Sequence, residues 1–192
     1  MLEQKGCAIP IHKPNSRELT FFFACGIIIS VPITLFIAGL ADSLLVGFDE
    51  FTATLLSVAI FAPFIEEFSK IFPLYYRHGE TQRSIMQLAV VVGLGFGLVE
   101  MITYVTLYGI VILPFRIPGL LFHPASTAIA AYGIAKKRPF LYYALAVSLH
   151  FLNNFLAVTT KSLPLSPSIL IVAATVWIAW SFYNKTTEKF IH

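Results

Sequence analysis

Charged residues are scarce in this sequence: Asp, Glu, Lys and Arg together make up only 12% of its 192 residues. Hydrophobic residues make up 57%, and the mean hydropathy is +0.80. This composition excludes most classes of soluble protein and is typical of a chain whose solvent is lipid. Because nearly every stretch is apolar, no room is left for a separate soluble domain. We therefore expect one transmembrane domain over residues 1–192.

Several motifs that carry hydrolytic chemistry are also missing. No aspartate lies in an apolar run, which excludes a pair of intramembrane aspartates. The sequence has no H-E-x-x-H and no G-x-S-x-G, so a zincin helix and a serine nucleophile elbow are excluded as well. The two cysteines, Cys7 and Cys25, are poorly placed for a disulfide and are interpreted as free thiols.

Long apolar runs are what the sequence has instead. A helix needs roughly 20 apolar residues to cross a hydrocarbon core of about 30 Å, and six runs approach that length. They cover residues 19–41, 51–76, 85–113, 118–135, 140–160 and 165–183. Pro114 and Pro118 separate the third run from the fourth. The fold class predicted is an all-α bundle of about six transmembrane helices. The length of the first run favours a retained helix over a cleaved signal peptide, although Gly39-Leu40-Ala41 could serve as a cleavage site and the sequence leaves this open.

The positions of Lys and Arg predict how the bundle lies in the membrane. One side of the predicted helices carries Lys5, Lys13, Arg17, Arg77, Arg83, Lys136, Lys137, Arg138, Lys185 and Lys189. The other side carries only Arg116 and Lys161. Cytoplasmic loops are enriched in basic residues, so both termini are predicted to be cytoplasmic, with residues 1–18 as an N-terminal segment. Basic residues confined to short loops form no patch, and we expect no nucleic-acid partner.

A few ionisable side chains remain inside the predicted spans. They are Glu66, Glu67, Lys70, Glu100, His123 and His150. A charged group near the bilayer centre costs about 2.5–3.5 kcal/mol on insertion scales, so such groups face the interior of a bundle or water. With a rise of about 1.5 Å per residue, four helices bring these groups to a similar depth. We therefore predict a central polar site on the helices of residues 51–160.

Helical spacing relates the second helix's two acids to its lysine. Lys70 follows Glu66 by four residues and Glu67 by three, so it can pair with either carboxylate. The other carboxylate is then free for chemistry, and the sequence leaves open which one it is. Pro63 just upstream removes a backbone hydrogen bond and is expected to bend the helix near the pair.

The remaining chemistry is that of a glutamate acting on water. A carboxylate can serve as general base, while His123 and His150 stabilise an oxyanion or bind a metal. Glu100, His123 and His150 could form a three-ligand zinc site with water in the fourth position, or could hold a metal-free water by hydrogen bonds. The cofactor predicted is therefore none or zinc. Asn154, one turn after His150, is placed to hold an oxyanion or to orient its neighbours on the helix.

Four ordered motifs carry a family resemblance. They are Glu66-Glu67-x-x-Lys70, Phe96-x-x-x-Glu100, His123 and His150-x-x-x-Asn154. Together they resemble the PrsW family of intramembrane proteases and, more distantly, the superfamily of type II CAAX prenyl endopeptidases and bacteriocin-processing proteins. The resemblance implies an integral protein of a prokaryotic cell membrane that hydrolyses a peptide bond in a membrane-embedded or juxtamembrane substrate, such as an anti-sigma factor. It implies that the glutamate pair activates water with histidine assistance, and that Lys70, Phe96, Glu100 and Asn154 support them.

Asn154 departs from the PrsW pattern, which often has aspartate at that position, so the substrate class is not carried over. Two other functions are compatible with the residues. A proton-coupled transporter also uses intramembrane Glu and His, although the inverted repeats typical of transporters are not visible. The second function is that of a non-catalytic membrane scaffold. The scaffold subunit of gamma-secretase belongs to the related superfamily but lacks the glutamate pair. Glu66 and Glu67 therefore favour an enzyme, whose oligomeric state the sequence leaves open.

Overall fold

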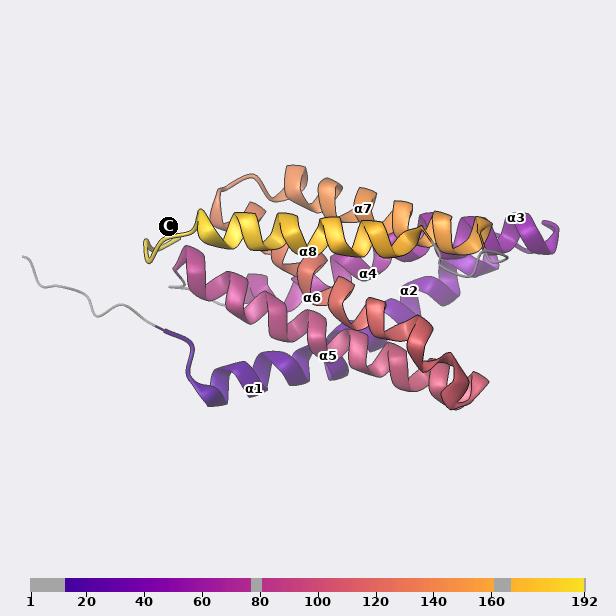
Figure 1. Cartoon of the computed structure of the whole chain (residues 1–192), viewed down its shortest axis with the longest axis horizontal. Helices are drawn as coiled ribbons and strands as arrows, with labels where there is room; N and C mark the ends of the chain where they lie inside the picture. The colour runs from indigo at the N-terminus through magenta and orange to yellow at the C-terminus, as the bar shows by residue number, and fades with distance from the viewer. Residues whose placement is uncertain (1–12, 77–80, 161–166, 192) are drawn as a thin grey trace, which may run out of the picture.

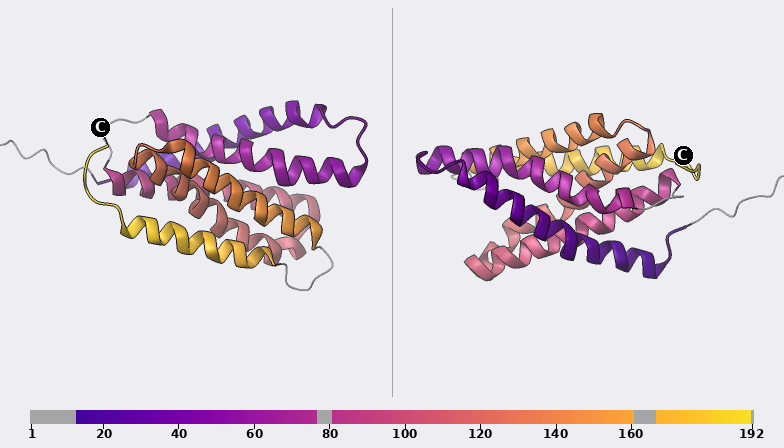
Figure 2. Two further views of the ribbon diagram at one scale, coloured as in Figure 1. Left: turned by 90° about the horizontal axis from the view of Figure 1, so that it is seen from above. Right: turned by 180° about the vertical axis from the view of Figure 1, so that it is seen from behind.

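The structure of this chain is a computed structural model that describes residues 13–76, 81–160 and 167–191. Within these ranges the chain is almost entirely helical, and the described β contact is an isolated antiparallel bridge between Thr81 and Phe190. The helices lie side by side along one long direction and form a bundle, which Figures 1 and 2 show from three sides. The predicted all-α fold is confirmed.

Six apolar helical stretches make up the bundle. The first comprises α1 (Ser16–Cys25), a π-helical stretch (Gly26–Ser30) and α2 (Val31–Ser43). The second comprises α3 (Glu50–Thr54), a π-helical stretch (Leu55–Phe61), α4 (Ala62–Ile71) and a 3₁₀ turn (Phe72–Tyr76). The others are α5 (Gln82–Tyr108), α6 (Leu113–Ala135), α7 (Pro139–Thr159) and α8 (Ser168–Asn184). Five stretches are long and apolar enough to cross a membrane, and α8 is a shorter apolar helix.

Both π-helical stretches end just before a proline. Pro32 and Pro63 lie in the first turn of α2 and α4, directly after the widened turns. A proline lacks the N–H that would bond four residues back, and its ring collides with that carbonyl. A wider turn accommodates both effects without ending the helix. The bend that was expected near Pro63 therefore takes the form of a π-helical stretch that ends about one turn before the glutamate pair.

The boundary between the third and fourth helices differs from the prediction. The predicted helices 85–113 and 118–135 are α5, which ends at Tyr108, and α6, which begins at Leu113. The break lies at Gly109, whose φ of +77° is a conformation that favours glycine. Pro114 lies in the first turn of α6, where a missing N–H costs nothing, and Pro118 lies inside the helix. Prolines therefore do not mark this boundary.

The other ends differ by a few residues. α1 begins at Ser16 rather than residue 19, because Asn15 and Glu18 form a capping box. α8 runs to Asn184, and residues 165–166 of the predicted sixth helix lie outside the described residues. Cys25 is a buried free thiol, whereas Cys7 lies outside the described part of the chain.

Glycines let α5 pack closely against its neighbours. A Cβ at Gly93 would lie 2.5 Å from the carbonyl oxygen of His123, so α5 and α6 touch backbone to backbone there. One turn later, a Cβ at Gly97 would lie 3.1 Å from Cδ2 of the His123 ring. Gly95, on another face, approaches the carbonyl oxygen of Phe23 in α1 in the same way. Small residues at helix interfaces allow such approaches in membrane proteins.

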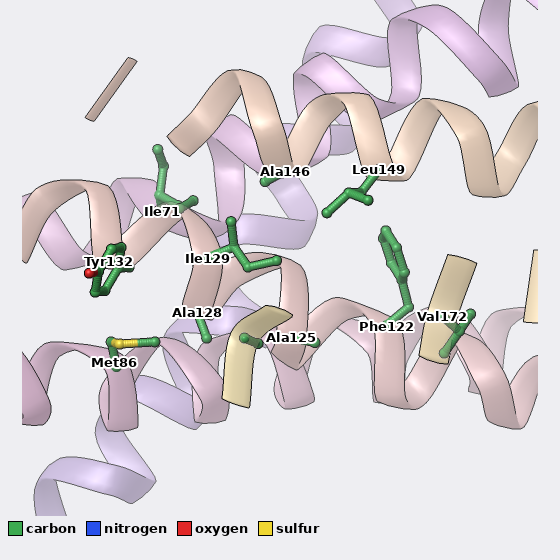
Figure 3. Close-up of a cluster of buried hydrophobic side chains, with 12 residues drawn as sticks. Ile71, Met86, Phe122, Ala125, Ala128, Ile129, Tyr132, Ala146, Leu149 and Val172 are labelled. Atoms are coloured by element: carbon green, nitrogen blue, oxygen red, sulfur yellow. The ribbon is translucent and has the colours of Figure 1, made fainter. Parts of the chain in front are cut away.

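A hydrophobic cluster holds the second half of the chain together. Figure 3 shows side chains from α4, α5, α6, α7 and α8 meeting around α6. Ile129 and Ala146 are fully buried, and Phe122 is almost so. Phe122 precedes His123 in the sequence, and its ring centroid lies 5.0 Å from that of His150. The cluster therefore fixes the helices that carry the predicted histidines.

One end of the bundle gathers basic residues. The C-terminal segment returns to the start of α5, where Gln82 N–H donates to the carbonyl of Lys189 and Arg83 donates to that of Thr186. Lys136, at the end of α6, donates to the Gln82 side chain at 2.8 Å. Figure 1 shows the described ends of the chain at this same end. That this end faces the cytoplasm stays a prediction. Three of the basic residues on which it depends, Lys5, Arg77 and Lys161, lie outside the described residues.

Candidate active site

A fully buried ion pair lies at the centre of the bundle. Lys70 Nζ donates to Glu67 Oε1 at 2.7 Å, and both side chains are completely inaccessible to solvent. Ser126 of α6 lies beside them, accepting from Lys70 at 3.2 Å and donating to Glu67 Oε1 at 3.0 Å. Removing one member of such a pair leaves an uncompensated charge in a dry interior. We call Glu67, Lys70 and Ser126 the sealed network.

The sealed network fixes the protonation pattern of His150. Nδ1 of His150 lies 2.8 Å from Glu67 Oε1. Because an ionised carboxylate only accepts, this nitrogen carries a hydrogen and donates it. A neutral His150 then has its lone pair on Nε2, on the far side of the ring. A carboxylate that holds one imidazole nitrogen in this way orients the other for catalysis or metal binding.

His123 is held from both sides. Its Nδ1 lies 3.1 Å from Lys70 Nζ, and its Nε2 lies 2.6 Å from Glu100 Oε2. An ammonium has no lone pair to offer, so Nδ1 accepts and Nε2 carries the hydrogen donated to Glu100. His123 therefore links the sealed network on α4 to a carboxylate on α5. Both of its ring nitrogens are occupied.

Glu66 differs from Glu67, its neighbour in sequence. Oε2 of each residue is buried without a hydrogen-bond partner among the described residues, but Glu67 Oε1 is bonded by Lys70 and His150, whereas no such bond is described for Glu66. Glu66 Oε2 lies 3.8 Å from His150 Nε2, too far for a direct hydrogen bond but suited to a bridging water. The Glu66 side chain keeps 15% of its surface exposed, whereas that of Glu67 keeps none. Lys70 pairs with Glu67, and Glu66 is the carboxylate left free.

A polar cavity of about 90 Å³ adjoins the two histidines and Glu100. Its wall includes Glu100, Arg116, His123, His150, Asn153 and Asn154. Such a volume holds several water molecules. The cavity is lined by residues of α5, α6, α7 and the start of α8, and Lys70 is not among the lining residues. It is the space in which a substrate group can meet the histidines.

The structure brings the other predicted site residues to the same region, though not all in the predicted arrangement. The Phe96 ring lies 5.4 Å from Lys70 Nζ and 5.2 Å from the His123 ring, and shields both. Asn154 lines the cavity, but its Nδ2 donates to the carbonyl of Val58 at 2.9 Å, and its Oδ1 accepts from Asn153. The amide thus ties α7 to the π-helical stretch that precedes α4.

Sequence reasoning missed two members of the site. Ser126 carries a hydroxyl, which is not ionisable and so gives no signal among the intramembrane charges. Its place one turn after His123, on the same face of the helix, could have indicated it. Arg116 was predicted to lie in a loop outside the membrane. It lies instead within α6, 3.8 Å from Glu100 Oε1, and its guanidinium carbon is 3.1 Å above the Tyr104 ring centroid.

A metal ion held by Glu100, His123 and His150 does not fit this arrangement. A histidine that binds a metal normally donates its other ring N–H to an acceptor. His150 meets that requirement through Glu67, but Nδ1 of His123 faces an ammonium. Over the described ranges, no three His, Cys, Asp or Glu side chains converge closely enough to hold a metal ion. The imidazole and carboxylate donors are nonetheless of the types that zinc prefers.

Comparison with known proteins gives one match. The model of the PrsW family of intramembrane metalloproteases matches residues 15–181, which include every site residue described above. None of the curated proteins and none of the solved structures matches the chain significantly. The match covers most of the sequence and agrees with a bundle of membrane-spanning helices around a buried polar site. This chain belongs to the PrsW family of intramembrane metalloproteases.

Proposed function

We propose that this protein hydrolyses a peptide bond of a membrane-embedded or juxtamembrane substrate, with Glu66 as the general base. One observation carries the assignment of the base: Glu66 Oε2 is an unpartnered carboxylate oxygen 3.8 Å from His150 Nε2, on a side chain that remains partly exposed, whereas Glu67, whose Oε2 is also unpartnered, is fully buried. A buried acceptor left unsatisfied is costly, so its retention needs a reason. A catalytic water supplies that reason.

The geometry suits a water between two acceptors. A water bonded to Glu66 Oε2 and His150 Nε2 donates one hydrogen to each and keeps its lone pairs free to attack. As the water oxygen bonds to the carbonyl carbon, one of its protons passes to Glu66. When the C–N bond breaks, Glu66 returns that proton to the leaving nitrogen. A carboxylic acid and an amine result, and no co-reactant besides water is needed.

The other residues then have positioning roles. Glu67 orients His150 by accepting from Nδ1, and Lys70 keeps Glu67 ionised. His123 holds Glu100 against the cavity wall at 2.6 Å. These roles refine the prediction that both glutamates and both histidines act directly. The proposed reaction uses no metal ion, because both ring nitrogens of His123 are engaged in this arrangement.

Glu66→Gln is the decisive variant, because it keeps the shape of the side chain and removes its basicity. We expect cleavage of a single-span membrane substrate by the purified protein to fall by about 10²–10⁴-fold, the range for loss of a general base. Its thermal unfolding in detergent should match that of the parent. The matched control is Glu50→Gln, an exposed acid at the start of α3.

Three results would separate the alternatives. Unchanged cleavage by Glu66→Gln would remove Glu66 as the base. Loss of activity on dialysis against a chelator, restored by zinc, would show that a metal takes part and that His123 changes partners to accommodate it. Uptake of solutes by proteoliposomes, in the absence of any cleavage, would favour a transporter.

A further inference from the structure

The proposed reaction creates a charge that its assigned residues do not stabilise. Attack on a carbonyl places a negative charge on the carbonyl oxygen, and sites that hydrolyse peptides aim hydrogen-bond donors at that oxygen. Glu66, Glu67 and Glu100 are acids. Both ring nitrogens of His123 are occupied, and His150 donates its N–H to Glu67.

The two other polar candidates are also engaged. Lys70 is fully buried and bonds Glu67, Ser126 and His123, so it cannot reach a substrate in the cavity. Asn154, which the sequence placed in this role, donates from Nδ2 to the Val58 carbonyl.

Arg116 is the cation that faces the cavity. Its guanidinium lines the same wall as Glu100, His123 and His150, and its side chain keeps 32% of its surface exposed. Its contact with Glu100 Oε1 is 3.8 Å long, an ion pair without the close bidentate geometry that would occupy its N–H groups. Because a guanidinium has five N–H donors, its contacts with Glu100 and with the Tyr104 side chain leave donors for a ligand.

The aromatic ring of Tyr104 holds the guanidinium of Arg116 in position. The guanidinium carbon lies 3.1 Å above the ring centroid of Tyr104, which is one turn after Glu100 on α5. Stacking on an aromatic ring holds the plane of an arginine and directs its N–H groups along the edge of that plane. Arg116 lies in the first turn of α6, within a stretch long and apolar enough to cross a membrane, where arginines turn toward cavities or the interface. The cavity of about 90 Å³ is lined by both Arg116 and His150, and Nε2 of His150 lies 3.8 Å from Glu66 Oε2, so a carbonyl in the cavity lies near the guanidinium and near the proposed water.

We propose that Arg116 is a catalytic residue of this protein that binds the scissile carbonyl oxygen and stabilises the oxyanion formed by water attack. The inference rests on the proposed function, because it needs hydrolysis at this site. The guanidinium donates N–H hydrogens to the oxygen and transfers no proton. When the C–N bond breaks, the negative charge leaves that oxygen and the interaction weakens again.

The test compares Arg116→Gln and Arg116→Lys with the parent on one single-span membrane substrate. For Arg116→Gln we expect kcat to fall by about 10²–10³-fold, the cost of removing an oxyanion donor, with KM changed less than threefold. Arg116→Lys should recover part of that loss. Arg138→Gln, an exposed arginine at the opposite end of the bundle, is the matched control and should retain full activity.

A purely structural role for Arg116 would act through its pairing with Glu100. Glu100→Gln keeps an oxygen for His123 and removes the charge that Arg116 compensates. We expect Arg116→Gln to reduce kcat equally in the parent and in the Glu100→Gln background. If it has no effect in that background, Arg116 serves only to balance Glu100 and the proposal is overturned.

A phosphinate analogue of the substrate peptide gives a second measurement, because its tetrahedral anion resembles the intermediate. Arg116→Gln should weaken analogue binding by about the same factor as kcat, and unchanged binding would overturn the proposal. Failure of the proposed function looks different: Glu66→Gln would then cleave normally, whatever Arg116 does. Retained dependence on Glu66 without dependence on Arg116 would remove this inference alone.

Discussion

The two neighbouring glutamates of α4 occupy opposite environments, and the contrast organises the site. Glu67 points into the sealed network, where an ammonium, a hydroxyl and an imidazole satisfy its Oε1 within 3.0 Å. Glu66 lies outside that network, with Oε2 3.8 Å from His150 Nε2, and remains partly exposed. Adjacent residues on a helix are turned by roughly 100° from one another, so a pair of acids can serve two faces. In the proposed function, Glu67 orients His150 and Glu66 acts on water.

The largest effect expected on stability comes from breaking the sealed network. Lys70→Met removes the compensating charge and should cost about 3–5 kcal/mol, because Glu67 would remain buried and ionised alone. Thermal or denaturant unfolding in detergent measures the change. Adding Glu67→Leu should recover much of the loss, since the double variant buries no charge. Lys136→Met, at the edge of the bundle, is the control and should change stability by less than about 1 kcal/mol. Equal stability of Lys70→Met and the parent would mean that Glu67 is already neutral.

An intermediate effect on stability is expected where α5 packs against α6, the helix that carries His123 and Ser126. Gly93→Ala would place a Cβ 2.5 Å from the His123 carbonyl oxygen and should cost about 1–3 kcal/mol by separating α5 from α6. Gly39→Ala is the matched control. Nothing lies within 4 Å of its Cβ, and alanine favours a helix over glycine, so the variant should be neutral or stabilising. Unfolding of the two variants side by side measures the contrast. A stable Gly93→Ala protein would contradict the close helix contact.

The smallest effect concerns a charge outside the membrane. Asp49 caps α3 by accepting from Thr52 N–H at 3.0 Å. Hydrogen bonds from the Thr52 side chain and from its N–H hold the pKa of the Asp49 carboxyl below the ordinary value. A lowered folded pKa means that the cap stabilises the protein above the unfolded pKa and that this contribution is lost as the pH falls through the folded value. Acid titration of Asp49 by NMR should give a value below that of an unstructured aspartate. A normal value would show that the cap does not form in solution.

Much of this fold could be predicted, because the hydropathy of each stretch and the free-energy cost of a charge inside the membrane can both be read from the sequence. Twenty-residue apolar runs identify the helices, and the price of an intramembrane charge singles out Glu66, Lys70 and Glu100 as neighbours in space. The boundary before α6 was wrong because proline is tolerated in a first helical turn, while Gly109 with its positive φ ends α5. That error also displaced Arg116 into a loop.

The division of labour between the glutamates could not be predicted. Lys70 lies within reach of both, and only the packing of α6 and α7 decides which carboxylate meets Ser126 and His150. Asn154 shows the same limit, because its partner Val58 belongs to a helix distant in sequence. Contacts between helices depend on rotations that no single run of residues specifies.

The π-helical stretch Leu55–Phe61 has a consequence for how this site tolerates changes in chain length. Such a stretch accommodates one residue more per turn than an α-helix. Deleting a single residue there would return the backbone to α-helical spacing without rotating α4 relative to α3. The same deletion in a regular stretch of α-helix would rotate everything after it by roughly 100° and carry Glu66 away from His150. The π-helical stretch is thus the part of this helix where the position of Glu66 is least sensitive to the loss of one residue.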